Sequence, residues 1–174
     1  MPAPRLSCPT TWCTTTAGRP ASSTTWSGSS GAGRPAVVVP HAKLPETDSE
    51  RVLLAWNAGR AAARAANDAL PILEAAKEVL ILSINPEPGI MGHGELPGAD
   101  IATHLARHGI SGEVVQVTAD RTQVADELLR QIAAFNADFM VMGSYGSFRL
   151  RELVFGGVTR RILDTMTVPI YLSR

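Results

Sequence analysis

Between residues 51 and 174 the sequence alternates five times between a short apolar run and a longer amphipathic stretch. A continuous apolar run is typical of a strand that is buried on both faces, and such strands belong to parallel sheets. Parallel strands need crossover connections, which place helices against both faces of the sheet. The sequence therefore predicts an α/β protein, a three-layer sandwich around a five-stranded, mostly parallel sheet. The predicted strands are residues 52–56, 79–84, 114–118, 139–142 and 168–172.

The amphipathic stretches predict the helices of the two outer layers. In the first stretch, residues 59–76, Pro71 is expected to kink or split the helix. The second helix is expected to stop at Gly109, a residue typical of helix C-termini. Thr122 is the expected N-cap of the third. The second helix is predicted at residues 99–108 and the fourth at residues 156–165. The buried face of the third comprises Val124, Leu128, Leu129, Ile132 and Phe135.

The first fifty residues differ in composition from the rest of the chain. Residues 1–32 are rich in Ser, Thr, Pro and Gly and poor in aliphatic side chains, so they are predicted to be disordered. In residues 33–50, the proline-bracketed run Ala36–Val39 predicts a short edge strand, which a linker follows. We therefore expect one folded domain, at residues 51–174.

Charge and hydropathy argue against several classes of partner. The 174 residues carry 16 basic and 16 acidic side chains, so no overall field attracts the protein to nucleic acid or to an anionic membrane. The apolar runs are much shorter than the ~20 residues that a membrane-spanning helix needs, and no secretory signal is evident. The sequence thus indicates a soluble, cytoplasmic protein. Cys8 and Cys13 lie in the low-complexity tract and predict neither a metal site nor a redox pair.

A glycine-punctuated loop follows the predicted fourth strand. It reads Met142-Gly143-Ser144-Tyr145-Gly146, then nine residues, then Gly156-Gly157-Val158-Thr159. Glycines let a backbone approach a ligand closely, and a helix that begins there directs free N–H groups and the positive end of its dipole at an anion. In open α/β sheets the ligand lies where the winding direction reverses, here at the ends of the predicted first and fourth strands. The loop is therefore a candidate phosphate-binding site, with ordinary turn glycines as the alternative.

With this motif, and with Val168-Pro169-Ile170-Tyr171-Leu172 in register, the region from Arg51 to Arg174 resembles the universal stress protein family. The resemblance implies the Rossmann-like fold of the adenine nucleotide alpha hydrolases. It also implies a stress-response protein that binds ATP, alone or with Mg²⁺, as a regulator and not as an enzyme. The nucleotide site that the resemblance implies comprises Ala55, Asn57, Ile84, Met142, Gly143, Gly146, Gly156, Gly157 and Val158.

Two positions depart from the pattern of the nucleotide-binding members. Those members usually carry Gly-Ser where this chain has Gly156-Gly157, and an Asp where it has Asn57. A lost hydrogen bond to a charged group costs roughly 1.5–3 kcal/mol, which corresponds to at least about a tenfold loss of affinity. Asn57 could instead form an Asx turn, and Ile84 could simply belong to the core. The second hypothesis is therefore a nucleotide-free module of the same fold that serves dimerisation or partner docking.

The remaining polar residues predict neither a metal site nor catalysis. His104 and His108 lie four residues apart on one predicted helix, but they lack a third ligand and read as surface histidines. Arg160 and Arg161 flank the loop, yet with Asp164 they also fit a solvated helix face. No Gly-x-Ser-x-Gly elbow is present.

The valine run near the N-terminus echoes the last predicted strand. Residues 33–40 resemble the final strand of another stress-protein domain, so the chain looks like a tandem member of the family that keeps only the last strand of its first domain. A bare final strand would expose unpaired backbone groups. We expect either intramolecular pairing of that strand with Ala36–Val39 or a homodimer formed through it.

Overall fold

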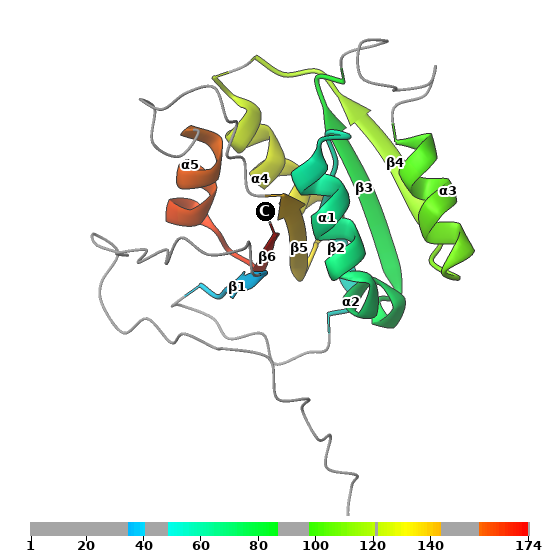
Figure 1. Cartoon of the computed structure of the whole chain (residues 1–174). Helices are drawn as coiled ribbons and strands as arrows, with labels where there is room; N and C mark the ends of the chain where they lie inside the picture. Colours follow the sequence, from blue (N-terminus) through cyan, green and yellow to red (C-terminus); the bar gives the residue numbers. More distant parts are fainter. Residues whose placement is uncertain (1–34, 41–48, 87–97, 121, 144–156, 174) are drawn as a thin grey trace, which may run out of the picture.

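The computed structural model describes residues 35–40, 49–86, 98–120, 122–143 and 157–173. These residues form a six-stranded sheet with helices packed against both faces (Figure 1). The strands lie side by side in the order β1-β6-β5-β2-β3-β4. Their bounds are β1 (Ala36–Val38), β2 (Arg51–Ala55), β3 (Glu78–Ile84), β4 (Gly112–Val117), β5 (Phe139–Gly143) and β6 (Ile170–Ser173).

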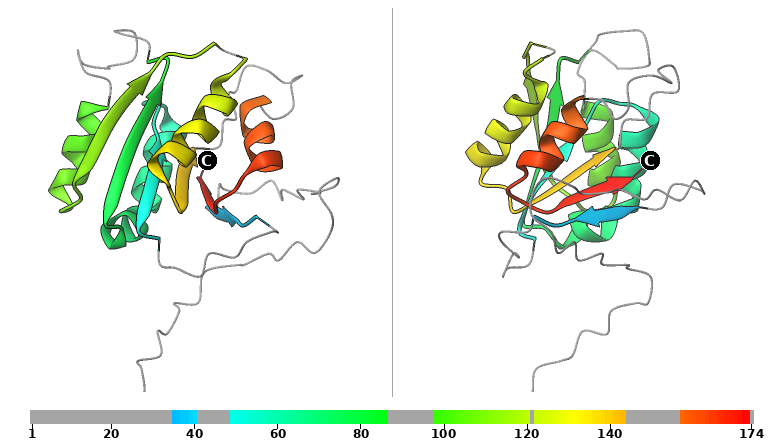
Figure 2. Two further views of the ribbon diagram at one scale, coloured as in Figure 1. Left: turned by 180° about the vertical axis from the view of Figure 1, so that it is seen from behind. Right: turned by 90° about the vertical axis from the view of Figure 1, so that its left-hand side faces the viewer.

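Helices cover the sheet in two layers, and their bounds are α1 (Arg60–Asp68), α2 (Leu70–Ala75), α3 (Ala99–Arg107), α4 (Val124–Phe135) and α5 (Gly157–Thr165). Figures 1 and 2 show α1, α2 and α3 on one face of the sheet and α4 and α5 on the other. Alternate side chains of each strand fill the two cores. In β3, for example, Ile81 packs with α1, α2 and α3, whereas Leu80 and Leu82 pack with α4 and α5. The predicted three-layer α/β sandwich is confirmed.

The sheet has one strand more than the five predicted, because the valine run near the N-terminus joins it. Strand β1 pairs antiparallel with β6, with Val37 opposite Tyr171 and Val38 opposite Ile170. The two valines pack into opposite cores. The other neighbouring strands all pair in parallel. The expected intramolecular pairing is thus confirmed for Ala36–Val38.

The expected helix boundaries at Pro71 and Gly109 are confirmed. The first helical stretch is split between α1 and α2, and Pro71 lies in the first turn of α2, where its missing N–H group costs the helix no hydrogen bond. Gly109 follows α3 with a φ of 77°, a left-handed conformation that glycine adopts without strain.

The predicted N-cap of α4 is wrong. Gln123, not Thr122, occupies that position. The reason is a turn just before the helix, in which the Gln123 N–H donates to the Asp120 carbonyl at 2.8 Å. The predicted inward face of the helix is confirmed, since its members are buried or half-buried: Val124, Leu128, Leu129, Ile132 and Phe135.

The low-complexity tract of residues 1–32 lies outside the described residues. Within the part of the chain that the structure describes, none of the helices combines the length and the apolar character needed to cross a membrane.

Candidate functional site

The winding direction of the sheet reverses between β2 and β5, as the sequence predicts. These strands are parallel neighbours, with Ala55 of β2 opposite Met142 of β5. After β2 the chain enters α1 on one face of the sheet, whereas α5, which lies between β5 and β6 in the sequence, packs on the other face (Figure 1). The carboxyl ends of β2 and β5 and the N-termini of α1 and α5 therefore share one edge of the sheet. Such an edge is the usual ligand site in open α/β folds.

Asn57 lies at this edge, two residues after the end of β2. Its side chain is exposed, and its Oδ1 accepts a hydrogen bond from the Gly59 N–H at 3.1 Å. This contact is an Asx turn, which directs the chain from the strand into α1. The structure thus places Asn57 at the same end of the sheet as Gly143 and assigns its carbonyl oxygen to the local turn.

Gly143, the last residue of β5, is buried directly beneath α1. A Cβ atom at this position would lie 2.5 Å from the carbonyl carbon of Ala61 and 2.5 Å from the amide nitrogen of Ala62. Both atoms belong to the helix backbone, so they cannot move aside as a flexible side chain would. Close packing between strand and helix therefore requires glycine here, whether or not a ligand binds.

Helix α5 begins at Gly157, one residue after the predicted start, and because it follows the carboxyl end of β5 and leads back to the start of β6, its first turn lies at that same end of the sheet. The N–H groups of a first turn have no acceptor within the helix and can bind an anion. Val158 is half-buried and packs against the core that contains Met142. Thr159, which follows it, is buried.

The apolar residues predicted for the site lie on adjacent strands near their carboxyl ends. Ala55 and Ile84 are half-buried, at the ends of β2 and β3, and Met142 is buried in β5. All three belong to, or pack against, the core on the α4 and α5 side of the sheet. The structure thus brings together Ala55, Asn57, Ile84, Met142, Gly143, Gly157 and Val158 at one edge, whereas Gly146 and Gly156 lie outside the described residues.

Asn85 also shapes this edge and was missed by the sequence analysis. It follows β3 with a φ of 51°, and its side chain makes two hydrogen bonds to one residue beyond β4. Its Nδ2 donates to the Ala119 carbonyl at 2.6 Å, and its Oδ1 accepts from the Ala119 N–H at 2.8 Å. These bonds hold the ends of β3 and β4 together and position the neighbouring Ile84. The available signal was an Asn at a strand end, since Asn tolerates positive φ.

The two arginines of α5 each form an ion pair with an aspartate. Arg160 lies 3.9 Å from Asp164, which agrees with the predicted solvated helix face. Arg161 contacts Asp126 of α4 instead, with 2.9 Å between Nε and Oδ1. This second pair ties the two helices of one layer together.

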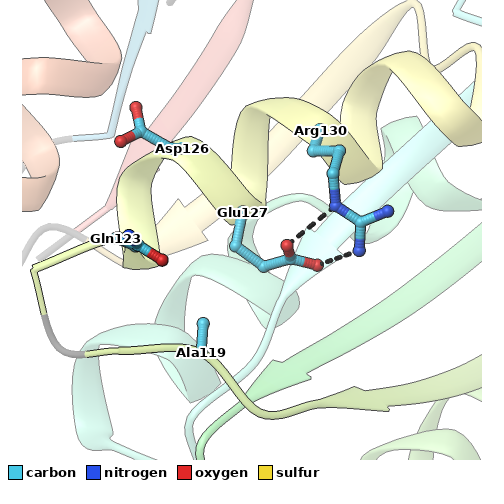
Figure 3. Close-up of a pocket in the computed structure, with 5 residues that line it drawn as sticks. All are labelled: Ala119, Gln123, Asp126, Glu127 and Arg130. Carbon is cyan, nitrogen blue, oxygen red and sulfur yellow. Dashed lines mark hydrogen bonds and ion pairs between the residues drawn. The ribbon is translucent and has the colours of Figure 1, made fainter.

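A pocket of about 300 Å³ opens near the start of α4, lined by Ala119, Gln123, Asp126, Glu127 and Arg130 (Figure 3). The Glu127 carboxylate accepts hydrogen bonds from Arg130 at 2.6 and 2.8 Å and from Gln131 at 2.8 Å. The hydrogen bonds from Arg130 and Gln131 lower the pKa of Glu127 below its ordinary value. The charged side chains of this pocket thus already have partners, since Glu127 and Arg130 bind each other and Asp126 binds Arg161 of α5.

His104 of α3 and His108, the residue just after this helix, contact their immediate surroundings. His104 Nε2 lies 3.1 Å from Asn67 Oδ1, and its ring packs edge-on against His108 with 5.0 Å between centroids. Across the described ranges, His, Cys, Asp and Glu side chains form no group of three or more that could hold a metal ion.

Comparisons with known proteins place this architecture in a family. The model of the universal stress protein family matches residues 37–174. A search of curated proteins finds no match.

Several solved structures share the fold. Hypothetical protein MJ0577 has a TM-score of 0.57 and 18% identity, over 73% of this chain and 96% of that chain. A universal stress protein from Archaeoglobus fulgidus DSM 4304 has a TM-score of 0.63 and 19% identity; the match covers 79% of this chain but only 48%, about half, of that one. A universal stress protein in complex with cAMP has a TM-score of 0.51 and 16% identity, over 72% and 97% of the two chains. Because the family model matches most of the sequence, this chain belongs to the universal stress protein family.

Proposed function

We propose that this protein binds an adenine nucleotide at the edge formed by β2 and β5, and that it acts as a non-catalytic stress-response regulator in the cytoplasm. The observation that carries the proposal is the meeting of two strand ends and two helix N-termini at the reversal point of the sheet. Helix N-termini favour phosphate, and apolar side chains beside them favour a base. Among solved structures of the same fold, one holds cAMP.

Each part of the nucleotide has a suitable counterpart at this edge. Ile84 and Val158 are half-buried and offer apolar surface to the adenine and ribose, whereas Met142, whose side chain is buried, offers its backbone. The first-turn N–H groups of α5, which begins at Gly157, would bind phosphate oxygens. The proposed ligand is ATP, with or without a bound Mg²⁺.

Equilibrium titration with labelled ATP tests the proposal directly. We expect saturable binding with a Kd below a millimolar, and no release of inorganic phosphate over the same period. Denaturing the freshly purified protein and separating its small molecules by chromatography gives a second readout, in which ATP or AMP is expected. Affinity weaker than millimolar, together with an empty chromatogram, would refute nucleotide binding.

A nucleotide-free module for dimerisation or partner docking is the second candidate, and two observations favour it. Gly143 is required by the packing of α1, and Asn57 completes an Asx turn. Two features of the implied site therefore have structural reasons that need no ligand. Under this second function, the protein would be purified without nucleotide and would associate through its surface irrespective of added ATP.

A further inference from the structure

Two histidines at the end of α3 form a pair that the nucleotide edge does not involve. His104 lies in the last turn of the helix and His108 is its C-terminal cap, one turn further on. Residues four apart lie on the same side of a helix, and these two rings pack edge-on with 5.0 Å between centroids. His104 is half-buried and His108 is exposed. The structure thus gives the pair a definite geometry at the protein surface.

The separation of the two rings suits a shared metal ion. Imidazole nitrogens bind Zn²⁺ at about 2.0–2.1 Å, so two rings that hold one ion at a bond angle of roughly 90–110° have centroids roughly 4.5–5.2 Å apart. The 5.0 Å between His104 and His108 falls within this range. Two histidines four residues apart on one helix face are a known zinc-binding arrangement. His108 is exposed, so its ring can turn a nitrogen toward the ion.

Hydrogen bonds determine which nitrogen of His104 is free. Asn67 of α1 donates from its Nδ2 to the Ala63 carbonyl at 2.8 Å, which orients its side-chain amide. The amide oxygen, Oδ1, lies 3.1 Å from His104 Nε2. Because an amide oxygen can only accept, Nε2 of the neutral imidazole carries the proton and Nδ1 keeps the lone pair that a metal needs. Histidines that bind metals almost always have such a second hydrogen bond, which orients the ring.

The surroundings of the pair favour a positive ion. Asn67 lies in the last turn of α1 and His104 in the last turn of α3, and these two helices pack on the same face of the sheet (Figure 1). The C-terminal end of a helix carries partial negative charge and stabilises a cation. Of the neighbouring arginines, Arg64 is paired with Asp68. Arg107 is exposed, so water and salt screen its charge.

We propose that His104 and His108 together bind one divalent transition-metal ion of the group that imidazole prefers, which includes Zn²⁺, Cu²⁺ and Ni²⁺. In the described part of the chain no third residue of the usual metal-binding types joins them. The other coordination positions are therefore open to water or to a side chain of another molecule. The site is separate from the nucleotide edge, because α1 runs about 10 Å from its first residue, Arg60, to Asn67. The proposal thus does not depend on nucleotide binding.

Calorimetric titration of the full chain with Zn²⁺, without a histidine tag and without nucleotide, tests the site. We expect saturable binding of one ion and a rise in melting temperature with Zn²⁺, because an ion that binds the folded state stabilises it. Asn67→Ala removes the acceptor that orients His104, and such a loss should weaken Zn²⁺ binding at least about tenfold. His104→Gln and His108→Gln each remove a ligand, so they should weaken binding further and abolish the rise in melting temperature.

Cu²⁺ provides a spectroscopic measure of the ligands. The electron paramagnetic resonance spectrum of the wild type with equimolar Cu²⁺ should show coupling to two nitrogen nuclei, and that of either histidine variant to one at most. The matched control is the double variant His41→Gln, His93→Gln, which removes the other two of the four histidines in the chain. It should leave the Zn²⁺ affinity and the Cu²⁺ spectrum unchanged.

Three results would overturn the proposal. The first is a wild type that shows no saturable binding of Zn²⁺. The second is equal Zn²⁺ affinity in the wild type and in His108→Gln, and the third is an equal loss of affinity in the control double variant, which would place the ion elsewhere. Should His104→Gln lower the melting temperature without metal, His108→Gln decides the case, because its position is exposed and lies beyond the helix.

Discussion

At Gly143 the constraint on residue type comes from the helix packed above it. The contact joins the end of β5 to the backbone of Ala61 and Ala62, at the point where α1 crosses the strand. A glycine of this kind keeps strand and helix together, in the manner of a packing glycine. In a sequence motif it is indistinguishable from a glycine that approaches a phosphate.

Gly143→Ala should therefore destabilise the protein even without nucleotide. The added methyl group would meet α1 backbone atoms at 2.5 Å, and overpacking of this kind costs about 1–3 kcal/mol. Urea denaturation of the free protein measures the loss. Gly109→Asn is the control, because no atom lies within 4 Å of a Cβ there and Asn tolerates the left-handed φ. Equal stability of Gly143→Ala and the wild type would contradict the packing explanation.

At the scale of elements, β1 covers the outer side of β6, whose backbone groups would otherwise be unpaired. The four residues of β6 are all buried, and their backbone needs partners on both sides, which β5 and β1 supply. Prolines at positions 35 and 40 flank β1, and a residue without an N–H group discourages further strand addition. The short strand thus both completes the sheet and ends it.

Deleting residues 1–45 should expose the edge of β6. The shortened protein loses the β1 backbone bonds and the packing of Val37 and Val38, so its melting temperature should fall, or its mass by light scattering should rise as two β6 edges pair. Deletion of residues 1–34 alone keeps β1 and serves as the control. If both deletions melt and scatter like the full chain, β1 does not protect the edge.

At the scale of the whole molecule, the pH dependence of stability should report the burial of Tyr171 on β6. The residue is 1% exposed, and burial, assisted by the nearby Asp68 carboxylate, raises the pKa of Tyr171 to about 12. An unfolded tyrosine ionises near pH 10. Because the folded pKa is the higher one, the folded state holds the proton more tightly, and this contribution to stability is complete below about pH 10 and lost as the pH rises toward 12.

Tyr171→Phe tests this dependence. The free energy of unfolding of the wild type, measured relative to the variant by urea denaturation, should decline between about pH 10 and pH 12 and stay constant below that window. Absorbance of tyrosinate in the folded wild type should confirm that one ring titrates late. A constant difference between the two proteins across the window would show that Tyr171 does not resist ionisation.

The order of elements and the class of fold follow from local patterns in the sequence. Apolar runs and amphipathic periods depend only on neighbouring residues, and so does the helix split at Pro71. The edge where a ligand would bind follows from the alternation of strands and helices, because parallel winding fixes where it reverses. For the same reason, Asn57, Gly143 and Gly157 could be assigned to one end of the sheet in advance.

Contacts between distant residues were decided only by the tertiary structure. The sequence left open whether β6 pairs with β1 or with a second copy, since both satisfy the same backbone groups. It could not distinguish a packing glycine at 143 from a ligand glycine, because the α1 backbone that excludes a Cβ is about eighty residues away. The contact between Asn67 of α1 and His104 of α3 is likewise invisible in a sequence, because it depends on how the two helices pack.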